Sequence, residues 1–281
     1  WAAGFNKQYP GITVDLISAG SGELLTKIKA EKGNPRGDVV YFTNASFDAD
    51  LSLYQSFKHP NHDLWPNQSV GKDLKYYATI DTLYTLILNT KEMSRADAPK
   101  SWKELGDPKY KGKFLMANPA LSGSAYNQLA TFVQLYGWYL VEDIVANAVI
   151  VPKSRLAYSL VAKGEYPFGV TEETKAYVEA AKGFPTVSIY PSDGMPMMGA
   201  GTGIIKNAPN MKNAELLATF IGSKEGLDIV VNVRGRRVPR TDVKQPKGLP
   251  PISTLKVLYD FDVVKAAASR DAYLKKFDKI F

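Results

Sequence analysis

Cysteine is absent from the 281-residue chain, and histidine occurs only twice. Without cysteine, the chain has no thiol nucleophile, no disulfide and no cysteine-ligated zinc site. This composition suits an exported bacterial protein, but it does not by itself fix the compartment. Long apolar runs are also missing, since none approaches the roughly 18 residues that a membrane-spanning helix needs.

The scarcity of histidine also limits the catalytic chemistry. His59 and His62 lie in "KHPNHD", where proline and asparagine indicate a surface loop, and no third metal ligand is nearby in the sequence. A Ser-His-Asp triad would need one of these two histidines, and the chain has neither a G-x-S-x-G elbow nor a G-x-x-x-x-G-K-[ST] phosphate loop. The stretch "GAGTG" (199–203) lacks the full spacing of a dinucleotide loop. We therefore predict no catalytic residue, no cofactor and no enzymatic activity.

The residues that are present indicate a soluble protein of two lobes. Hydrophobic residues make up 45% and charged residues 22% of the chain, as in ordinary globular proteins. A chain of 281 residues is long for a single core. The net charge of +7 can attract anions, but the cations are scattered except in "RGRR" (234–237). This distribution does not indicate a nucleic-acid-binding protein.

Helical and strand-like segments alternate along the chain, which predicts an α/β fold. A long, continuous, β-rich segment, "YYATIDTLYTLILNT", suits a strand that crosses between lobes. We expect the other strands in "ITVDLIS", "DVVYF", "KFLMA", "YPFGVT" and "VSIYP", and helices in residues 1–11, 23–33, 46–57, 125–137, 172–183, 213–223, 224–233 and from about 260 to the end.

Two segments share the order strand, Ser/Gly turn, helix: "ITVDLISAGSGELL" and "KFLMANPALSGSAYNQL". In open α/β sheets, ligands bind beyond the carboxyl ends of the strands, where helix N-termini present free backbone N–H groups. Glycine lets a ligand approach the backbone closely, and serine adds a hydroxyl donor, so each turn is a candidate anion site. The alternative is ordinary helix capping by serine. Glu172 and Glu173 after "GVT" also have two interpretations: contacts to a ligand's hydroxyl or amino group, or favourable charges at a helix start.

Several longer segments together resemble the bacterial extracellular solute-binding proteins of ABC importers, in the branch that binds ferric ion, phosphorylated sugars and phosphonates. The matching segments are "GSGELLTKIKAEKGNPRGDVV", "SWKELGDPKYKGKFLMANPALSGSAYNQLATFVQLYG", "VAKGEYPFGVT", "IYPSDG" and "GIIKNAPNMKNAELLATFIGSKEG", which extend to about residue 235. The resemblance implies a type II periplasmic-binding-protein fold: two α/β lobes joined by crossing hinge strands, with the ligand in the interlobe cleft. The family's first strand precedes Trp1 and is missing from this sequence.

The resemblance also implies lobes and site residues. We expect lobe 1 to contain residues 1–81, 85–98 and 203–240, and lobe 2 to contain residues 99–202 and 245–281. The ligand-binding residues that match the family are, in order, Ser21, Gly22, Thr43, Asn44, Ser122, Gly123, Ser124, Ala125, Tyr126, Ser154, Arg155, Glu172, Glu173 and Thr174. Ferric-binding relatives have a tandem tyrosine pair after the strand matching "FGVT", where this sequence has Glu-Glu-Thr.

We therefore expect a monomeric, exported substrate-binding component of an ABC importer, periplasmic or membrane-anchored outside the cell, with the importer's membrane permease as its partner. Its ligand is a small anionic solute, either an organophosphate such as a sugar phosphate or a phosphonate, with Arg155 as a charge partner. The alternative within the family is ferric iron held by Tyr126 and Glu173, and a more distant alternative is an enzyme on the same scaffold.

Overall fold

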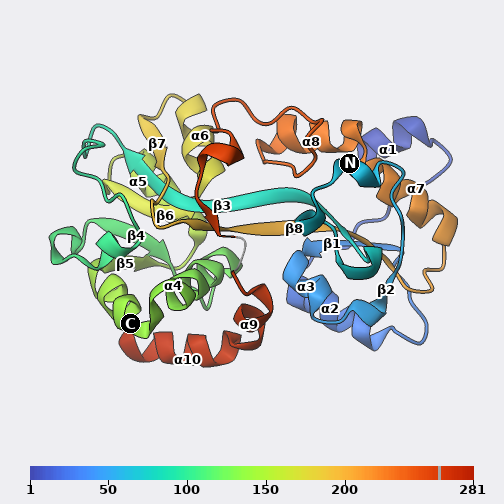
Figure 1. Ribbon diagram of the computed structural model, residues 1–281, viewed down its shortest axis with the longest axis horizontal. Helices are drawn as coiled ribbons and strands as arrows, with labels where there is room; N and C mark the ends of the chain where they lie inside the picture. The colour runs from blue at the N-terminus through green and yellow to red at the C-terminus, as the bar shows by residue number, and fades with distance from the viewer. Residues whose placement is uncertain (259–260) are drawn as a thin grey trace. The chain divides into compact units, whose positions relative to one another are not determined.

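The computed structural model describes residues 1–258 and 261–281, and the chain divides into two compact units (Figure 1). The first unit comprises Trp1–Asp81 and Met198–Lys247, and the second comprises Thr82–Met197 and Gly248–Phe281. Two strands, β3 (Tyr77–Asn89) and β8 (Met195–Ile205), contribute residues to both units. In the described ranges, no helix has the length and apolar character needed to cross a bilayer.

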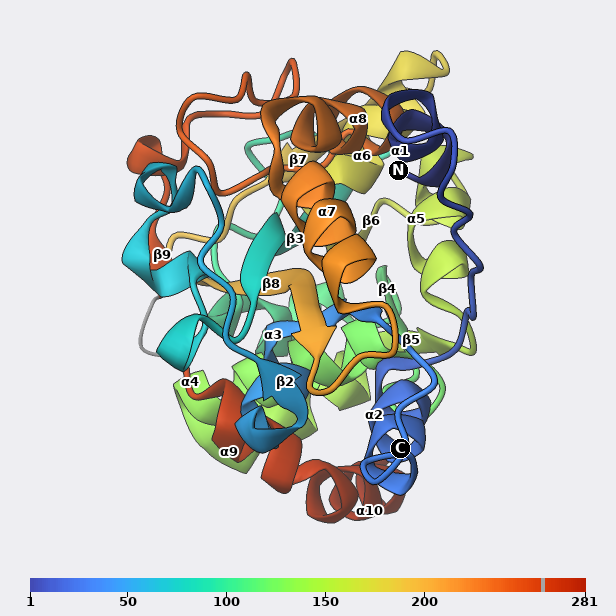
Figure 2. The same ribbon diagram turned by 90° about the vertical axis from the view of Figure 1, so that its right-hand side faces the viewer.

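The first unit is built around the second half of β8. This strand pairs antiparallel with β1 (Val39–Thr43) and with β2 (Tyr54–Gln55). Helix α1 (Ala2–Gln8) packs on α7 (Met211–Gly222), with the rings of Phe5 and Phe220 5.7 Å apart (Figure 2). The other helices of this unit are α2 (Ser21–Ala30), α3 (Asn44–Asp48) and α8 (Lys224–Arg234).

The "GAGTG" stretch lies inside β8, where its glycines permit close packing. A Cβ on Gly201 would lie 2.2 Å from the carbonyl oxygen of Tyr77, and one on Gly203 would lie 2.5 Å from the ring of Phe47. A Cβ on Gly199 would lie 2.3 Å from the amide nitrogen of Asn44. These glycines therefore serve strand and side-chain packing rather than a nucleotide loop.

The second unit contains parallel strands followed by helices. Strand β4 (Phe114–Ala117) pairs parallel with β5 (Ala148–Val151) and β6 (Phe168–Glu172), while β3 pairs antiparallel with β6 and with β7 (Thr186–Ile189). Helix α4 (Gly123–Asn147) follows β4, α5 (Ser154–Ala162) follows β5, and α6 (Glu173–Ala181) follows β6. Because the three strands are parallel, the N-termini of these helices lie at one edge of the sheet.

The remaining elements complete the second unit and the connections. Strand β9 (Val257–Leu258) pairs parallel with the start of β8, and the chain ends in α9 (Val263–Ala268) and α10 (Arg270–Ile280). Short 3₁₀ helices lie at Leu51–Leu53, His62–Leu64, Asn67–Ser69, Lys72–Leu74, Lys103–Gly106, Pro108–Tyr110 and Ile252–Thr254.

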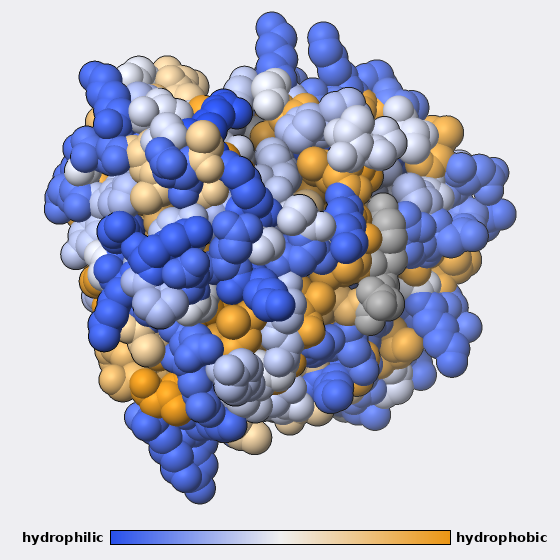
Figure 3. All heavy atoms as spheres, turned by 60° about the vertical axis from the view of Figure 1, so that its left-hand side comes forward, coloured by the Kyte–Doolittle hydropathy of each residue, from blue (hydrophilic) through white to orange (hydrophobic). Residues whose placement is uncertain are grey.

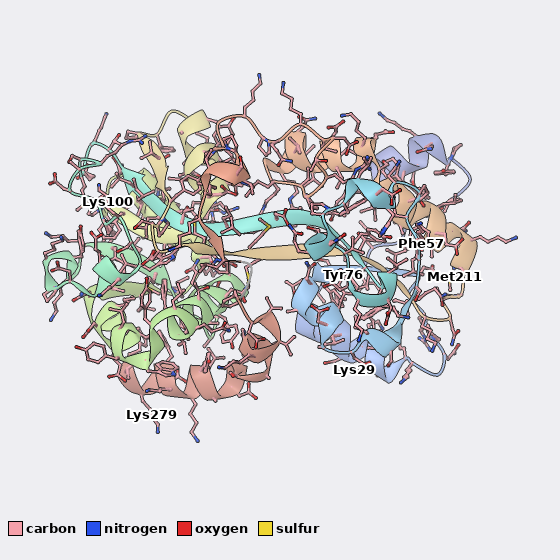
Figure 4. The ribbon with its side chains drawn as sticks, viewed as in Figure 1. Lys29, Phe57, Tyr76, Lys100, Met211 and Lys279 are labelled. Carbon is pink, nitrogen blue, oxygen red and sulfur yellow. The ribbon has the colours of Figure 1, made fainter. Side chains whose placement is uncertain are left out.

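Charged residues are distributed over the surface. The face in Figure 3 is mostly hydrophilic, with hydrophobic residues in smaller patches. Figure 4 labels Lys29, Lys100 and Lys279, which are exposed on three separate segments.

Three of the predicted elements differ from the structure. Residues 12–18 form no strand, because no strand in the described part of the chain pairs with them, and Leu16 and Ile17 are 79% and 68% exposed. The helix predicted over 46–57 stops at Asp48, and the chain continues in a 3₁₀ turn capped by Asp50, whose carboxylate accepts the N–H of Ser52. Helix α4 runs ten residues past Gly137, where a φ of 71° produces a kink.

The lobe boundaries also differ at their edges. Residues 85–98 lie in the second unit, since Tyr84–Leu88 pairs with β6 and Leu86–Asn89 pairs with β7. Residues 198–202 lie in the first unit, because Ala200–Ile204 pairs with β1. These two differences arise where a crossing strand changes partners. Residues 245–247, expected in lobe 2, also lie in the first unit.

The expectation that His59 lies in a surface loop is wrong. Its side chain is 1% exposed, and its Nε2 lies 3.0 Å from the carbonyl oxygen of Thr219 on α7. Its Nδ1 accepts the N–H of Asn61. His59 is thus a buried structural residue with both ring nitrogens engaged. In the described ranges, no group of three metal-ligating side chains occurs.

Candidate functional site

Three serine hydroxyls meet where α4 and α5 begin. The Oγ of Ser124 lies 3.1 Å from that of Ser122 and 2.9 Å from that of Ser154, and Ser122 and Ser154 are also in hydrogen-bond contact. Ser122 caps α4, since its Oγ accepts the N–H of Ala125 at 3.3 Å. We call Ser122, Ser124 and Ser154 the serine cluster.

The pairing of β4 with β5 brings these distant serines together. The two strands run in parallel from Phe114 opposite Ala148 to Ala117 opposite Val151. The loops that follow are joined as well, because the N–H of Asn118 donates to the carbonyl oxygen of Val151 at 2.8 Å. The two helix starts therefore lie side by side. The sequence motif around Ser122 predicts the start of α4 but not its neighbour.

The serine cluster can donate hydrogen bonds to an anion. Each hydroxyl has one proton that it can direct either to a neighbouring serine or outward to a ligand oxygen. The first-turn N–H groups of Gly123 and Ser124 have no carbonyl partner within α4 and add further donors. The N-termini of α4 and α5 also each carry a partial positive charge, which favours a phosphate or carboxylate.

Tyr126, one turn into α4, interacts with the C-terminal segment. It is 4% exposed, and its hydroxyl donates a hydrogen bond to the carbonyl oxygen of Ala266 on α9. The guanidinium of Arg270 lies 4.5 Å from the centre of its ring. Burial raises the pKa of Tyr126 to about 12, although the charge of Arg270 opposes this rise. The ring thus packs against α9 and α10, and its hydroxyl is protonated at neutral pH.

The carboxylates at the start of α6 are engaged with neighbouring side chains. Glu172 forms an ion pair of 2.8 Å with Lys175. Glu173 is 1% exposed and accepts a hydrogen bond of 2.9 Å from the hydroxyl of Tyr190. Thr174 is buried as well, and within the described residues its Oγ1 makes no hydrogen bond. These contacts agree with the interpretation that the two glutamates stabilise the start of α6. That they also contact a ligand stays a prediction.

Tyr190 is a candidate that the sequence did not indicate. It follows β7 in a segment that reads as an ordinary strand, and only the fold brings its hydroxyl to Glu173. Arg155, the expected charge partner, follows Ser154 in the first turn of α5 and is exposed to solvent. Its role stays a prediction.

The expected site residues of the first unit lie at the starts of α2 and α3. Ser21 and Gly22 open α2 after an extended Gly20. Thr43 ends β1, and its Oγ1 lies 2.9 Å from the Oγ of Ser46 in α3. The two helices pack together, because Leu24 and Leu25 of α2 contact the hydrophobic cluster that contains Phe47 of α3.

Asn44 has an unused acceptor. Its side chain packs against Gly199 of β8, and its Oδ1 is buried without a hydrogen-bond partner in the described part of the chain. A buried acceptor of this kind is costly unless a donor reaches it. A ligand hydroxyl or amino group would satisfy it. Gly199 and Ser46 thus lie beside the expected site residues Asn44 and Thr43, a position that the sequence did not indicate for either.

The known proteins to which this chain is similar include solute-binding and periplasmic binding proteins. Residues 1–253 match the family described as bacterial extracellular solute-binding protein. A periplasmic protein of Salmonella typhimurium, named for the binding of 2-aminoethylphosphonate, is 25% identical over 83% of this chain and 71% of its own length.

Two solved structures illustrate the similarity of fold. The periplasmic binding protein AfuA from Actinobacillus pleuropneumoniae, with fructose-6-phosphate bound, is 26% identical, with a TM-score of 0.81 over 99% of this chain and 92% of its own. Iron-bound HitA from Pseudomonas aeruginosa is 21% identical, with a TM-score of 0.85 over 98% of this chain and 93% of its own. At that identity, the likeness to HitA concerns the fold alone.

Proposed function

Because the chain belongs to the bacterial extracellular solute-binding protein family, we propose that it captures a small organophosphate or phosphonate for import. The family consists of exported, non-enzymatic components that deliver solutes to ABC importers. The predicted type II periplasmic-binding-protein fold and the absence of enzymatic activity agree with this assignment. The identity of the solute is the part that we propose.

The serine cluster is the observation that carries the proposal. Three hydroxyls, whose oxygens lie within 3.1 Å of one another, and two helix N-termini form a set of donors without a negative group in the cluster itself. A phosphate or phosphonate has three oxygens that accept such hydrogen bonds. The fructose-6-phosphate bound to AfuA and the 2-aminoethylphosphonate for which the Salmonella protein is named are compounds of this chemistry.

The compounds of the two relatives have hydrogen-bond donors besides the phosphorus group. Fructose-6-phosphate has hydroxyls, and 2-aminoethylphosphonate has an amino group. Inorganic phosphate offers few such donors at neutral pH. We therefore favour a phosphate or phosphonate group on an organic, hydrogen-bond-donating body.

Ferric iron is the competing ligand. Tyr126 is the tyrosine that the family pattern offers for iron, but its hydroxyl donates to Ala266 and its pKa is raised to about 12. Iron ligation would require the phenolate and the loss of that hydrogen bond. The engagement of this hydroxyl with Ala266 favours the anion over the metal.

Thermal-shift measurements with matched compounds test the proposal. We expect fructose 6-phosphate or 2-aminoethylphosphonate to raise the unfolding midpoint, because a ligand at 100 times its dissociation constant stabilises the native state by about 2.7 kcal/mol. Fructose, which lacks the phosphate, is the control and should give no shift. A shift with ferric citrate alone, or an equal shift with fructose, would contradict the proposal.

A further inference from the structure

A small cavity lies within the first unit, between the sheet and α7. Its walls include Phe57 and Tyr76, which Figure 4 labels, and Ala218 and Gly222 of α7. Its volume is about 10 Å³. A space of this size accommodates the centre of one water molecule and nothing larger.

Two buried hydroxyls line this cavity without a hydrogen bond. Thr79 of β3 is 0% exposed and Thr202 of β8 is 5% exposed, and both line the cavity. Within the described residues, the Oγ1 of each lacks a hydrogen-bond partner. Tyr41 lies directly opposite Thr202 on β1. Burial raises the pKa of the Tyr41 hydroxyl, and the contact of this hydroxyl with Thr79 lowers that pKa to a smaller extent.

The other polar side chains around the cavity already have partners. Both ring nitrogens of His59 are engaged, with Thr219 and Asn61. The hydroxyl of Tyr77 accepts the N–H of His59 and lies 3.0 Å from Nδ1 of His62. The Thr202 hydroxyl is therefore the group whose hydrogen bonding this cavity must supply, and the Thr79 hydroxyl faces the same space with the hydroxyl of Tyr41 beside it.

We propose that the cavity is a binding site for one structural water molecule, which bridges the hydroxyls of Thr79 and Thr202. A buried hydroxyl without a partner costs free energy, and a water with two or more polar partners removes that cost. An apolar cavity of the same size would stay empty of water. The hydroxyls of Thr79 and Thr202 are therefore the reason that this cavity is hydrated.

The position of this site gives the water a structural role. Thr79 lies on β3 and Thr202 on β8, the two strands that continue from the first unit into the second. The bridge joins these strands near the points where they leave the first unit, at Asp81 and Met198. It fixes their spacing on the face of β8 opposite to the one on which Gly201 and Gly203 require close packing, since side chains alternate along a strand.

Isosteric substitution tests the proposal, because the two possible states of the cavity predict opposite signs. In a hydrated cavity, Thr202→Val removes one partner of the water, and we expect the unfolding midpoint to fall by about 2–4 °C. In a dry cavity, the same change removes an unsatisfied hydroxyl and leaves the midpoint unchanged or higher.

Thr85→Val is the matched control. Thr85 lies on the same strand, is 0% exposed, and its Oγ1 also lacks a partner among the described residues, but it does not line the cavity. We expect this variant to keep or raise the midpoint. A crystal structure of the wild-type protein should also show a water within hydrogen-bond distance of Thr202 Oγ1. A cavity without ordered density, or a Thr202→Val midpoint that moves as that of Thr85→Val does, overturns the proposal.

Discussion

The side-chain oxygens of Ser124 and Ser154 lie 2.9 Å apart, although 30 residues separate them in the chain. Ser124 belongs to the first turn of α4 and Ser154 begins α5. The parallel pairing of β4 with β5 places these two helix starts next to each other. A turn that could have been an ordinary helix cap thus becomes part of a two-helix group of donors.

Removing one of these hydroxyls should weaken ligand binding strongly. For Ser124→Ala or Ser154→Ala, we expect the dissociation constant of the best phosphorylated ligand to rise roughly 10- to 100-fold, because a hydrogen bond to a charged group contributes about 1.5–3 kcal/mol. Isothermal titration calorimetry measures this change. The double variant should lose less than the sum, since both residues belong to one hydrogen-bonded network.

Ser159→Ala is the control for this experiment, because Ser159 lies on α5 but outside the serine cluster. Its affinity should match that of the wild type. Unchanged affinity in both Ser124→Ala and Ser154→Ala would remove the serine cluster from the binding site.

The sequence predicted much of the second unit because its elements are locally encoded. The segments "KFLMA" and "YPFGVT" form β4 and β6, and the Ser122 turn begins α4 as its capping serine indicates. The long segment after Tyr76 forms β3. Recognition of the family and its fold also rested on these segments, and both are confirmed.

The remaining features depend on contacts between distant residues. Residues 12–18 have strand-like composition, but a strand requires a partner, and the described residues offer none. Nothing in "KHPNHD" indicates that α7 covers His59. The contact of Tyr190 with Glu173 depends on the antiparallel pairing of β7 with β3, so the sequence did not predict it either. The ligand contacts of the other predicted site residues stay predictions.

Replacing Gly201 by alanine should destabilise the first unit. The new Cβ would lie 2.2 Å from the carbonyl oxygen of Tyr77. This oxygen belongs to the backbone of a paired strand, so moving it would cost hydrogen-bond energy. We expect a loss of about 1–3 kcal/mol, the usual cost of overpacking, and thermal unfolding measures it. At Gly33 a Cβ meets nothing within 4 Å, so Gly33→Ala should leave the midpoint nearly unchanged. Equal midpoints for the two variants would contradict this account of β8.

The buried His59 should make the stability of the protein sensitive to mild acid. Burial lowers the pKa of His59 to about 4 from its usual value of 6.5, and the charges of Arg240 and His62 lower it further, while the contact with Thr219 opposes the change. Because the folded pKa lies below the unfolded one, the unfolded state takes up the proton first as the pH falls. The contribution of His59 is therefore complete above about pH 6.5 and is lost progressively toward pH 4.

Two measurements check this behaviour. NMR titration of the two imidazole rings should show that the ring of His59 remains neutral at pH 5.5. Thermal unfolding between pH 7.5 and 4.5 should show a falling midpoint, with a shallower fall in His59→Gln, which has no ionisable group there. A His59 ring that titrates near pH 6.5 in the folded protein would exclude this source of acid sensitivity.

Tyr126→Phe separates the two candidate ligands. The substitution removes the hydroxyl that donates to Ala266 while keeping the ring under Arg270. If the ligand is a phosphorylated compound held by the serine cluster, its affinity should stay within about threefold, while stability falls by about 1 kcal/mol from the lost hydrogen bond. If the phenolate ligates iron, the variant should lose the tyrosinate-to-iron charge-transfer band and most of its iron affinity. Calorimetry with fructose 6-phosphate and absorption spectroscopy with ferric citrate therefore give opposite patterns for the two ligands. If iron produces an absorption band that Tyr126→Phe abolishes, the ligand is iron and not an organophosphate.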